Sequence, residues 1–577
     1  MYIGKNDSTC RLCKESCQRT KGNTTGLWLH LQSNHNQLYT KLQDSKKPKP
    51  QTSVQTKLSD HNTYPTGSKE HKDFVRQIVI FIVTGFHSFR IVDEPQFRIL
   101  LSNLNKRFVV PSSQTIRTTA FEACYKDTVE EMCEIFAKLP PRTLIHLTTD
   151  GWNSNDKFKS KYNSLTATFY EEHNESYRTL VLGISPSTTS NTAEFILAEL
   201  VQIMERYRIQ TGHFEFTLTT DTASVMKKLA KLTNTDIYNG WFKVSHWFGC
   251  IGHRLHLAIT RGQKGTTIYE AVAKAREFTS KYSRNSSLRS DLSSLTGKAI
   301  IHAPDNRWYY HVFEIERILE LRNEVKLVSR SYGMCFDDAD FELMEMYINA
   351  VAPMKIACEK LSKKSATIDL VIPTIDTILF DLQKSLTTLN EDGQQLVNNI
   401  IGEIDRIMNL SDLKNDRFVA LATFLNPAFK DLYIDSNDQI ECWLQNEEAV
   451  ESPLPSEFTE IIESEVDERR KILLQQNASK KSKMEKTGSK LSNQINSYVN
   501  QPITQKYVIV DPLEYWKKHK ELYPELAKMF FALNSRPSTQ VESERLFSAA
   551  GLLLDEKRSN LDPEKAEKYL ILNKFYK

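Results

Sequence analysis

Two predicted strands that each end at an aspartate constrain the fold of this chain more than any other feature. Residues 144–149 are rich in β-formers and run to Asp150, and residues 214–220 do the same and run to Asp221. Between these two strands lie further β-rich runs and one amphipathic helix. Carboxylates at strand ends offer the hard oxygen ligands that divalent cations prefer. The pattern therefore predicts an α/β core with a candidate metal site.

The segment between the two aspartates predicts which strands and helix make up the core and in what order they follow along the chain. Residues 164–170 and 179–184 are strand-like, and their spacing after residues 144–149 favours an antiparallel meander. Residues 191–194 resemble a capping-box start for the helix that follows. The side chains that we expect on the buried side of this helix are Phe195, Leu197, Leu200, Val201 and Met204.

Helical patterns dominate outside this core. Glycine and proline number only 19 each in 577 residues, which favours a helix-rich chain of several domains. Apolar residues recur at helical spacing over residues 70–139 and again over 268–449. Residues 451–504 are rich in Glu, Lys, Ser, Gln and Asn, and they predict a disordered or partly helical linker.

Several classes of protein are not expected from this sequence. The longest apolar run, residues 78–83, is far shorter than the roughly 20 residues of a membrane span. Polar residues begin at Gly4, so no apolar signal-peptide core is expected. Nine cysteines, an odd number in a long chain, indicate reduced thiols and a possible metal site. We therefore expect an intracellular protein.

The charge is unevenly distributed. The whole chain has a net charge of +3, yet residues 1–65 carry ten Lys or Arg against four acidic residues. A basic segment on a nearly neutral body is typical of a module that contacts nucleic acid, because neutralising phosphates supplies much of the affinity. A solvated basic terminus is the alternative.

A Cys₂His₂ pattern lies in this basic segment. Cys10-x2-Cys13 is followed after 16 residues by His30-x4-His35, which supplies two close ligand pairs for tetrahedral zinc. Cys17 is a competing ligand, and a chance spacing is the remaining alternative. The pattern and residues 27–35 resemble a BED zinc finger, a DNA-binding module. The only aromatic residue ahead of the first cysteine is Tyr2, so the module is shorter than that family's pattern.

Motifs along most of the chain resemble those of the hAT transposase superfamily, in the family's order. The most specific is Gln540–Gly551, which contains Ser-Glu-Arg, and it is followed by Lys557–Leu561. The other matching segments are Phe89–Pro111, Thr148–Trp152, Leu218–Asp221, Cys250–Leu255, Asn306–Trp308, Asp511–Trp516 and Tyr523–Ala527.

This resemblance implies an RNase H-like catalytic core interrupted by a large all-helical insertion. Asp150, Asp221 and Glu544 would form its DDE triad and bind Mg²⁺ or Mn²⁺. Two such ions can activate a water or a 3′-hydroxyl and stabilise the leaving oxygen. Each carboxylate has a structural alternative. Asp150 fits a turn, Asp221 is followed by Thr222 where the family usually has Asn, and Glu542 is a rival to Glu544.

The resemblance also implies DNA contacts outside the triad. Trp308, after Arg307, would stack on a flipped base, whereas a core tryptophan is the alternative. Arg545, beside Glu544, is a further candidate DNA contact. Cys250 and His253 lack a second ligand pair for zinc. We therefore assign His253 to contacts with DNA near the active site, with a structural role as the alternative.

The predicted organisation follows from these motifs. The chain divides into a finger (1–45), a linker (46–66), a helical dimerisation and DNA-binding region (67–140), the first part of the catalytic core (141–265), the insertion (266–450), a second linker (451–505), and a final segment (506–577) that completes the core and dimerises. The fold class is thus multidomain α+β.

The expected function is a cut-and-paste DNA transposase in the nucleus. By resemblance, it excises the element with hairpins on the flanking DNA and joins the 3′ ends to target DNA. The expected partners are double-stranded DNA and further copies of the chain, with no membrane and no small-molecule substrate. The alternative is a DNA-binding regulator derived from such a transposase, which no longer cuts.

Overall fold

A computed structural model describes most of the chain and divides it into two units. The described residues are 2–3, 7–18, 25–46, 63–153, 161–187, 192–210, 212–233, 243–300, 308–361, 363, 366–434, 436–445, 469, 472–473, 490–501, 511–554 and 562–577. The first unit comprises Met1–Ile78 and Phe89–Arg117, and the second comprises Val79–Ser88 and Thr118–Lys577. Among the described helices, none is both long and apolar enough to span a bilayer.

The N-terminal part of the first unit is a small module of three strands followed by two helices. Strands β1 (Tyr2–Ile3), β2 (Asp7–Thr9) and β3 (Ser16–Gln18) form an antiparallel sheet, and helices α1 (Thr25–Asn34) and α2 (Asn36–Lys46) follow. The turn between β2 and β3 is closed by backbone bonds from Lys14 to Cys10 and from Cys10 to Glu15. This turn holds both cysteines of the Cys₂His₂ pattern.

The remainder of the first unit includes the start of α3 (Lys69–Thr84), η1 (Phe89–Asp93), α4 (Pro95–Leu104) and α5 (Ser113–Thr115). Arg98 on α4 donates to the carbonyl oxygens of Val110 and Pro111 at 3.0 and 3.1 Å, which fixes the chain after the helix. Helical spacing correctly predicted α3 and α4. The leucines at 100 and 104, however, are 56% and 75% exposed.

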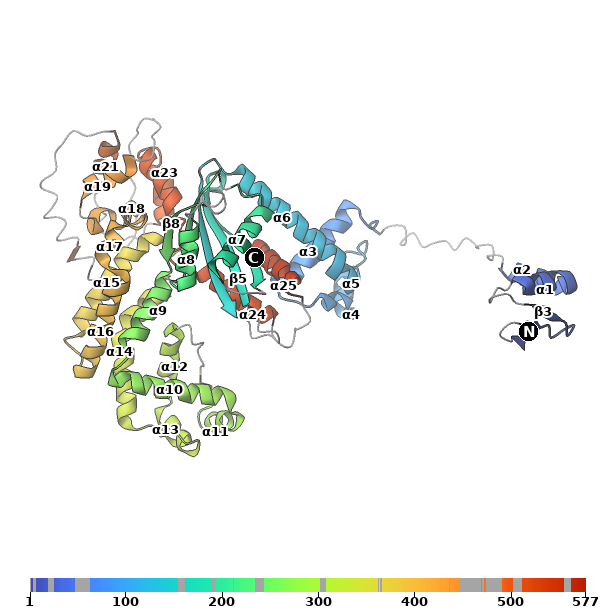
Figure 1. The fold of residues 1–577 in the computed structure, drawn as a ribbon, viewed down its shortest axis with the longest axis horizontal. Coiled ribbons are helices and arrows are strands. Elements are labelled where there is room, and N and C mark those ends of the chain that lie inside the picture. The colour runs from blue at the N-terminus through green and yellow to red at the C-terminus, as the bar shows by residue number, and fades with distance from the viewer. Residues whose placement is uncertain are drawn as a thin grey trace. The chain divides into compact units, whose positions relative to one another are not determined.

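A five-stranded mixed sheet forms the centre of the second unit (Figure 1). The strands are β4 (Leu144–Asn153), β5 (Lys161–Glu171), β6 (Ser176–Ser187), β7 (Glu215–Thr220) and β8 (Val244–Gly249), in the order β6-β5-β4-β7-β8. Strands β4, β5 and β6 pair antiparallel, whereas β4, β7 and β8 pair parallel. The predicted meander and the predicted strand to Asp221 are confirmed, and β8 is an addition.

Helices from both ends of the unit cover the sheet. Helices α6 (Phe121–Lys138), α7 (Ala193–Arg206) and α8 (Ser224–Leu232) are joined by α24 (Val541–Leu553) and α25 (Pro563–Tyr576) from the C-terminus, drawn red beside the cyan and green strands in Figure 1. Gly183 on β6 allows α7 and α25 to approach closely. A Cβ there would lie 2.9 Å from Ile203 and 3.1 Å from Glu567.

Helix α7 shows how local signals set these elements. Thr192, rather than Asn191, caps the helix, because its hydroxyl accepts the N–H of Phe195 at 3.3 Å. The aliphatic residues predicted on its inner side are buried, but Phe195 is only half-buried. The helix is then tied to the C-terminus by an ion pair of 2.8 Å between Arg206 and Glu567.

A helical region follows the sheet and shares one continuous apolar core, as the spacing of its apolar residues predicts. Its helices are α9 (Ile251–Gly262), α10 (Thr267–Arg284), α11 (Ser286–Thr296), α12 (Trp308–Glu320), α13 (Arg322–Ser331), α14 (Asp338–Leu361), α15 (Val371–Ser385), α16 (Glu391–Met408), α17 (Leu410–Asn415), α18 (Arg417–Leu425) and α19 (Asn437–Gln445).

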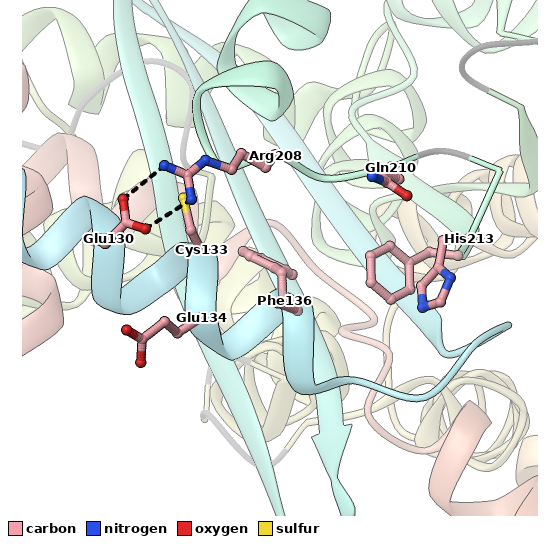
Figure 2. A pocket seen from close by; sticks show the side chains of 9 residues that line it. Glu130, Cys133, Glu134, Phe136, Arg208, Gln210 and His213 are labelled. Atoms are coloured by element: carbon pink, nitrogen blue, oxygen red, sulfur yellow. Dashed lines mark hydrogen bonds and ion pairs between the residues drawn. The ribbon is translucent and has the colours of Figure 1, made fainter.

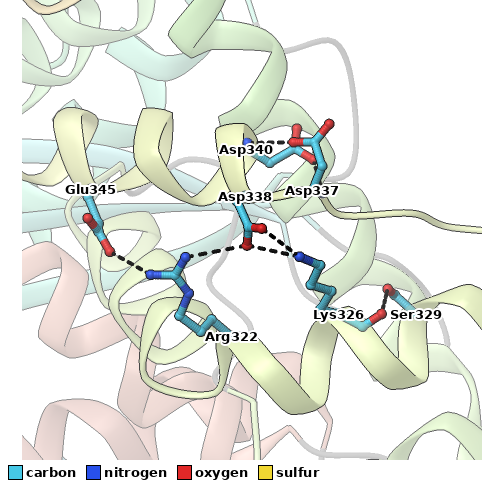
Figure 3. Close-up of polar contacts among 7 residues, drawn as sticks. All are labelled: Arg322, Lys326, Ser329, Asp337, Asp338, Asp340 and Glu345. Carbon is cyan, nitrogen blue, oxygen red and sulfur yellow. Dashed lines mark hydrogen bonds and ion pairs between the residues drawn. The ribbon is translucent and has the colours of Figure 1, made fainter.

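Charged side chains hold α13 against α14 on the surface of this region (Figure 3). Lys326 donates to both carboxylate oxygens of Asp338 at 2.9 Å. At the start of α14, Asp337 and Asp340 each accept the backbone N–H of the other, which is a reciprocal cap. These exposed pairs define the helix start and contribute little net stability.

The C-terminal helices α21 (Lys490–Asn500), α22 (Pro512–His519) and α23 (Pro524–Leu533) pack into the same helical core. Tyr498 and Trp516 are completely buried, and they donate to the carbonyl oxygens of Phe424 and Leu425 on α18. Helix α21 lies inside the predicted linker 451–505. A helix there agrees with the prediction of a partly helical segment, and its apolar side enters the helical core.

Candidate active site and metal centre

Four side chains form a compact ligand group in the N-terminal module. The ligand atoms of Cys10, Cys13, His30 and His35 all lie within 4.8 Å of one another. The thiol sulfur of Cys10 is 3.3 Å from Nε2 of His35, and that of Cys13 is 3.3 Å from Nε2 of His30. Two thiolates and two imidazoles are a fitting donor set for structural zinc.

The surroundings of this group favour metal binding. Backbone N–H groups of Cys13 and Leu12 lower the pKa of the Cys10 thiol to about 6, which favours the thiolate that zinc requires. Glu15 lies 3.8 Å from Nδ1 of His30 and can orient that ring as an outer partner. The side chain of Cys17, the predicted competitor, lies outside the described residues.

The three predicted catalytic carboxylates come from separate elements. Asp150 lies near the end of β4, and Asp221 directly follows β7. These parallel strands pair Thr148 with Thr219. Each aspartate lies two residues beyond this pair, so both stand at the same carboxyl-terminal end of the two strands. Glu544 is in the first turn of α24, which packs against β4 and β5.

The start of α9 lies among these carboxylates. Burial raises the pKa of the Cys250 thiol to about 12, and the negative charges of Glu544 and Asp150 act in the same direction. One turn later, the charge of Asp221 acts on His253. The charges of all three predicted carboxylates therefore act on residues at the start of one helix, although the three residues span almost 400 positions of the chain.

Backbone groups already orient two of the carboxylates. Oδ1 of Asp150 accepts the N–H of Gly151, and Oδ1 of Asp221 accepts the N–H of Ala223, both at 2.9 Å. Within the described part of the chain, the three carboxylates do not form a group as tight as the zinc ligands. Their hard oxygen donors nevertheless fit Mg²⁺ or Mn²⁺, which retain water and phosphate ligands beside a few carboxylates.

The neighbouring predicted residues have distinct surroundings. Burial lowers the pKa of His253 below its usual value, although the charge of Asp221 opposes the shift, so the ring is neutral at pH 7. Arg545 donates to Glu542 at 2.5 Å, which engages the rival carboxylate in an ion pair. Arg307 lies outside the described residues, and Trp308 begins α12 with its side chain outside the description.

The structure adds residues that the sequence did not single out for a role. Gly249 ends β8, and a Cβ there would lie 2.7 Å from Thr222, so its lack of a side chain makes room beside Asp221. Trp152 stacks on Phe547 with ring centroids 5.8 Å apart and joins β4 to α24. Both aromatic residues lie inside motifs that resemble those of the hAT superfamily, and this position is the only sequence feature that could have indicated a role for them.

A pocket of about 380 Å³ lies away from these carboxylates (Figure 2). His213 and Phe214 line it just before β7, whereas Asp221 follows the other end of that strand. Arg208 at its rim is engaged by both carboxylate oxygens of Glu130 at 2.8 and 2.9 Å. This pocket is therefore separate from the candidate active site.

The C-terminal segment is similar to a known family region. A model of the hAT family C-terminal dimerisation region matches residues 494–576, which include Glu544. Zinc finger BED domain-containing protein 4 from Homo sapiens is 21% identical over 592 residues, covering 94% of this chain and 48% of its own length.

Two further relatives are similar over different extents. The protein tpeD from Talaromyces stipitatus, named for a proposed role as a transcriptional regulator, is 20% identical over 546 residues, or 87% of this chain and 61% of that protein. Zinc finger BED domain-containing protein DAYSLEEPER from Arabidopsis thaliana is 30% identical over 84 residues, or 15% of this chain and 12% of its own length. The chain thus spans about half to three fifths of the two relatives that it matches along most of its length.

Proposed function

We propose that this chain belongs to the hAT family, carries a BED-type zinc finger and is a metal-dependent cut-and-paste DNA transposase. The observations that carry the proposal are the parallel register of β4 and β7, which carry Asp150 and Asp221, and the charges of both residues and of Glu544 acting on the start of α9. A sheet in which β5 is antiparallel between β6 and β4, with β7 and β8 parallel to β4, supports an RNase H-like core.

The residues of this site would divide the chemistry as follows. When bound, two divalent ions activate the attacking oxygen and stabilise the leaving oxygen of the scissile phosphate. Asp150, Asp221 and Glu544 would hold those ions. Neutral His253, beside Asp221, can donate one hydrogen bond to a phosphate oxygen without adding a charge that competes with the metals.

Other parts of the reaction rest on the family resemblance. After the first strand is cut, the flanking 3′-hydroxyl would attack the opposite strand and close a hairpin. Trp308 would stack on an unpaired base there, with Arg307 and Arg545 on the DNA backbone. The element's 3′-hydroxyl would then attack the target DNA. The finger, with zinc on Cys10, Cys13, His30 and His35, would bind DNA as other BED modules do.

We further propose a homodimer or larger assembly in the nucleus. The match to a hAT dimerisation region over 494–576 supports self-association, and two element ends must be held together for excision. The proposed boundaries remain 1–45 for the finger, 67–140 for the helical region, 141–265 and 506–577 for the core, and 266–450 for the insertion.

A DNA-binding regulator that does not cut is the second candidate. Two observations favour it: the relative tpeD is named for a regulatory role, and Thr222 follows Asp221 where the family usually has Asn. Against it stands the presence of all three carboxylates of the proposed triad. A regulator without cutting has no need of the triad.

A cleavage assay separates these candidates. The substrate is DNA carrying the terminal repeats of the element, with Mg²⁺ or Mn²⁺, and the variants are Glu544→Gln and Glu542→Gln. We expect hairpins and strand-transfer products from the wild type and from Glu542→Gln. Loss of a metal ligand should remove several kcal/mol of transition-state stabilisation, so Glu544→Gln should cut about 10³-fold more slowly.

The outcomes are distinct. If wild type binds the DNA but yields no cut strand in either metal, the regulator is the better description. If Glu542→Gln loses activity and Glu544→Gln retains it, the triad assignment is wrong at its third member.

A further inference from the structure

We infer that Gln540 is a positioning residue that sets the spacing of the three carboxylates, together with the backbone of Cys250. The inference rests on the proposed function, since it concerns the same site. Neither residue would touch DNA or metal in this role. Each acts on the backbone that carries the carboxylates.

Gln540 joins the segments that carry two of the carboxylates. Its side-chain Nε2 donates to the carbonyl oxygen of Thr149, the residue before Asp150, at 2.5 Å. Its own backbone carbonyl accepts the N–H of Glu544 at 3.0 Å. Gln540 is only 4% exposed, so water does not compete for these bonds. A single residue therefore fixes strand β4 against the first turn of α24.

Cys250 extends the link to the third carboxylate. Its backbone N–H donates to the carbonyl oxygen of Thr220, the residue before Asp221, at 2.7 Å. The backbone N–H of Ile251, the next residue, donates to the carbonyl oxygen of Ser538, two residues before Gln540, at 3.1 Å. The start of α9 thus connects the segment before Asp221 with the segment before Gln540.

The segment before Gln540 is held from both sides. Besides the bond from Ile251 to Ser538, the backbone N–H of Ile368 donates to the carbonyl of Arg536 at 3.0 Å. Arg536 is fully buried. These bonds attach the segment to α9 on one side and to the helical region on the other.

Contacts that run from Arg536 through His246 to Asp416 hold the same segment in place. Arg536 contacts Nδ1 of His246 on β8 at 2.5 Å, and Nε2 of His246 contacts Asp416 at 2.8 Å. Arg536 also donates to the carbonyl oxygen of Leu218 on β7 at 3.3 Å. These contacts fix the backbone just before Gln540, so its side chain can hold the carbonyl group of Thr149 in a defined position.

A glutamine suits this position for chemical reasons. Its neutral amide donates to a carbonyl without adding a negative charge beside three carboxylates. A leucine of similar size lacks the donor and would leave the buried carbonyl of Thr149 without this bond. Asparagine keeps the donor but is one methylene shorter and should fail to reach. Loss of an outer partner at a metal site typically weakens metal affinity about 10–100-fold.

The test measures Mn²⁺ binding directly, independently of cutting. Free Mn²⁺ is followed by its electron paramagnetic resonance signal during titration of the full-length chain with zinc already in the finger. We expect Gln540→Leu and Gln540→Asn each to weaken binding about tenfold or more. Gln494→Leu is the matched control, because Gln494 is 7% exposed and lies on α21. It should leave the Mn²⁺ affinity unchanged.

Two further readouts separate positioning from unfolding. Circular dichroism and the zinc content of each variant should match the wild type. Asp150→Asn reports whether the carboxylates bind Mn²⁺ at all. If Asp150→Asn loses the site while both Gln540 variants bind like wild type, the inference about Gln540 is overturned and the proposed function stands. If Asp150→Asn binds Mn²⁺ like wild type, the proposed metal site fails and the inference fails with it.

Discussion

His146 connects three segments of the core through one neutral ring. It is fully buried on β4, and its Nε2 lies 2.8 Å from the carbonyl oxygen of Ala532. Because a carbonyl only accepts, Nε2 carries the proton, and Nδ1 accepts from the Thr217 hydroxyl at 2.7 Å. Burial, reinforced by the positive charge of Arg536, lowers the pKa of His146 to about 3.

This shift predicts a loss of stability in acid. The unfolded chain, with an ordinary histidine pKa near 6.5, binds the proton before the folded chain does. The contribution of His146 is therefore complete above about pH 6.5 and declines by about 1.4 kcal/mol per pH unit as the pH falls toward 3. Thermal melts from pH 7 to 4 measure it. His146→Gln should give a shallower pH dependence, and an identical slope would contradict the assignment.

The zinc ligands make a separate prediction. His35→Asn should remove the bound zinc and unfold the finger alone, since a module of this size depends on its metal. Cys17→Ser should retain zinc, because the compact group contains Cys10 and Cys13. Zinc content by mass spectrometry decides between them. If Cys17→Ser loses zinc and Cys13→Ser keeps it, Cys17 rather than Cys13 is the zinc ligand.

For single residues, the sequence predicts the proposed catalytic side chains better than the residues that position them. Asp150, Asp221 and Glu544 stand in recognisable motifs, and their charges all act on residues at the start of α9. Gln540 stands in the same motif as Glu544, but a polar residue near a helix start gives no sign of its partner. The bond to Thr149 joins residues 391 positions apart, and only the fold brings them together.

Among the elements, β8 shows where periodicity fails. Its sequence, Val-Ser-His-Trp-Phe-Gly, does not alternate apolar and polar residues. His246 and Trp247 are half-buried there because they bond to Asp416 and Thr220. Parallel pairing to β7 supplies the stability that local pattern does not indicate. The antiparallel meander, by contrast, could be predicted, because its strands are rich in β-formers and close in sequence.

Helix α4 shows the opposite case, a correct helix whose apolar residues remain exposed. Leu100 and Leu104 are four residues apart and therefore share one side, with Ile99 beside them at 50% exposure. Clustered exposed leucines are typical of an interaction surface. The family resemblance assigns residues 67–140 to dimerisation, so a second copy is the proposed partner of this side.

Substitutions on α4 test that proposal. Leu100→Glu with Leu104→Glu should lower the dimer population by placing charges in the contact, whereas Ser102→Glu, on the same helix, should have little effect. Light scattering coupled to size exclusion measures the mass. A double variant that remains as large as wild type would exclude α4 from the interface.

At the scale of the whole molecule, the C-terminal segment is integral to both the sheet and the helical region. Tyr569 and Asn573 on α25 donate to the carbonyl oxygens of Ile82 and Val83, at the end of α3, at 2.7 Å. Tyr498 and Trp516 enter the helical core. The order of motifs predicted that distant segments share a core. The extent of this packing depends on contacts that no local pattern encodes.

This packing predicts a large effect from a single aromatic residue. Trp516→Ala should cost about 3–5 kcal/mol, because it removes a fully buried ring and its 2.7 Å bond to Leu425. Trp516→Phe fills most of the space and should cost less. Melting temperatures of the three proteins provide the comparison. Equal melting of Trp516→Ala and wild type would mean that α22 does not contribute to the core.

We propose that β4, β7 and α24 bring three carboxylates to one metal site. Anomalous scattering from Mn²⁺ in crystals of the chain tests it most directly. We expect Mn²⁺ to be bound by Asp150, Asp221 and Glu544 at the start of α9. Manganese bound by Glu542 in place of Glu544, or no manganese at these carboxylates at millimolar concentration, would contradict it.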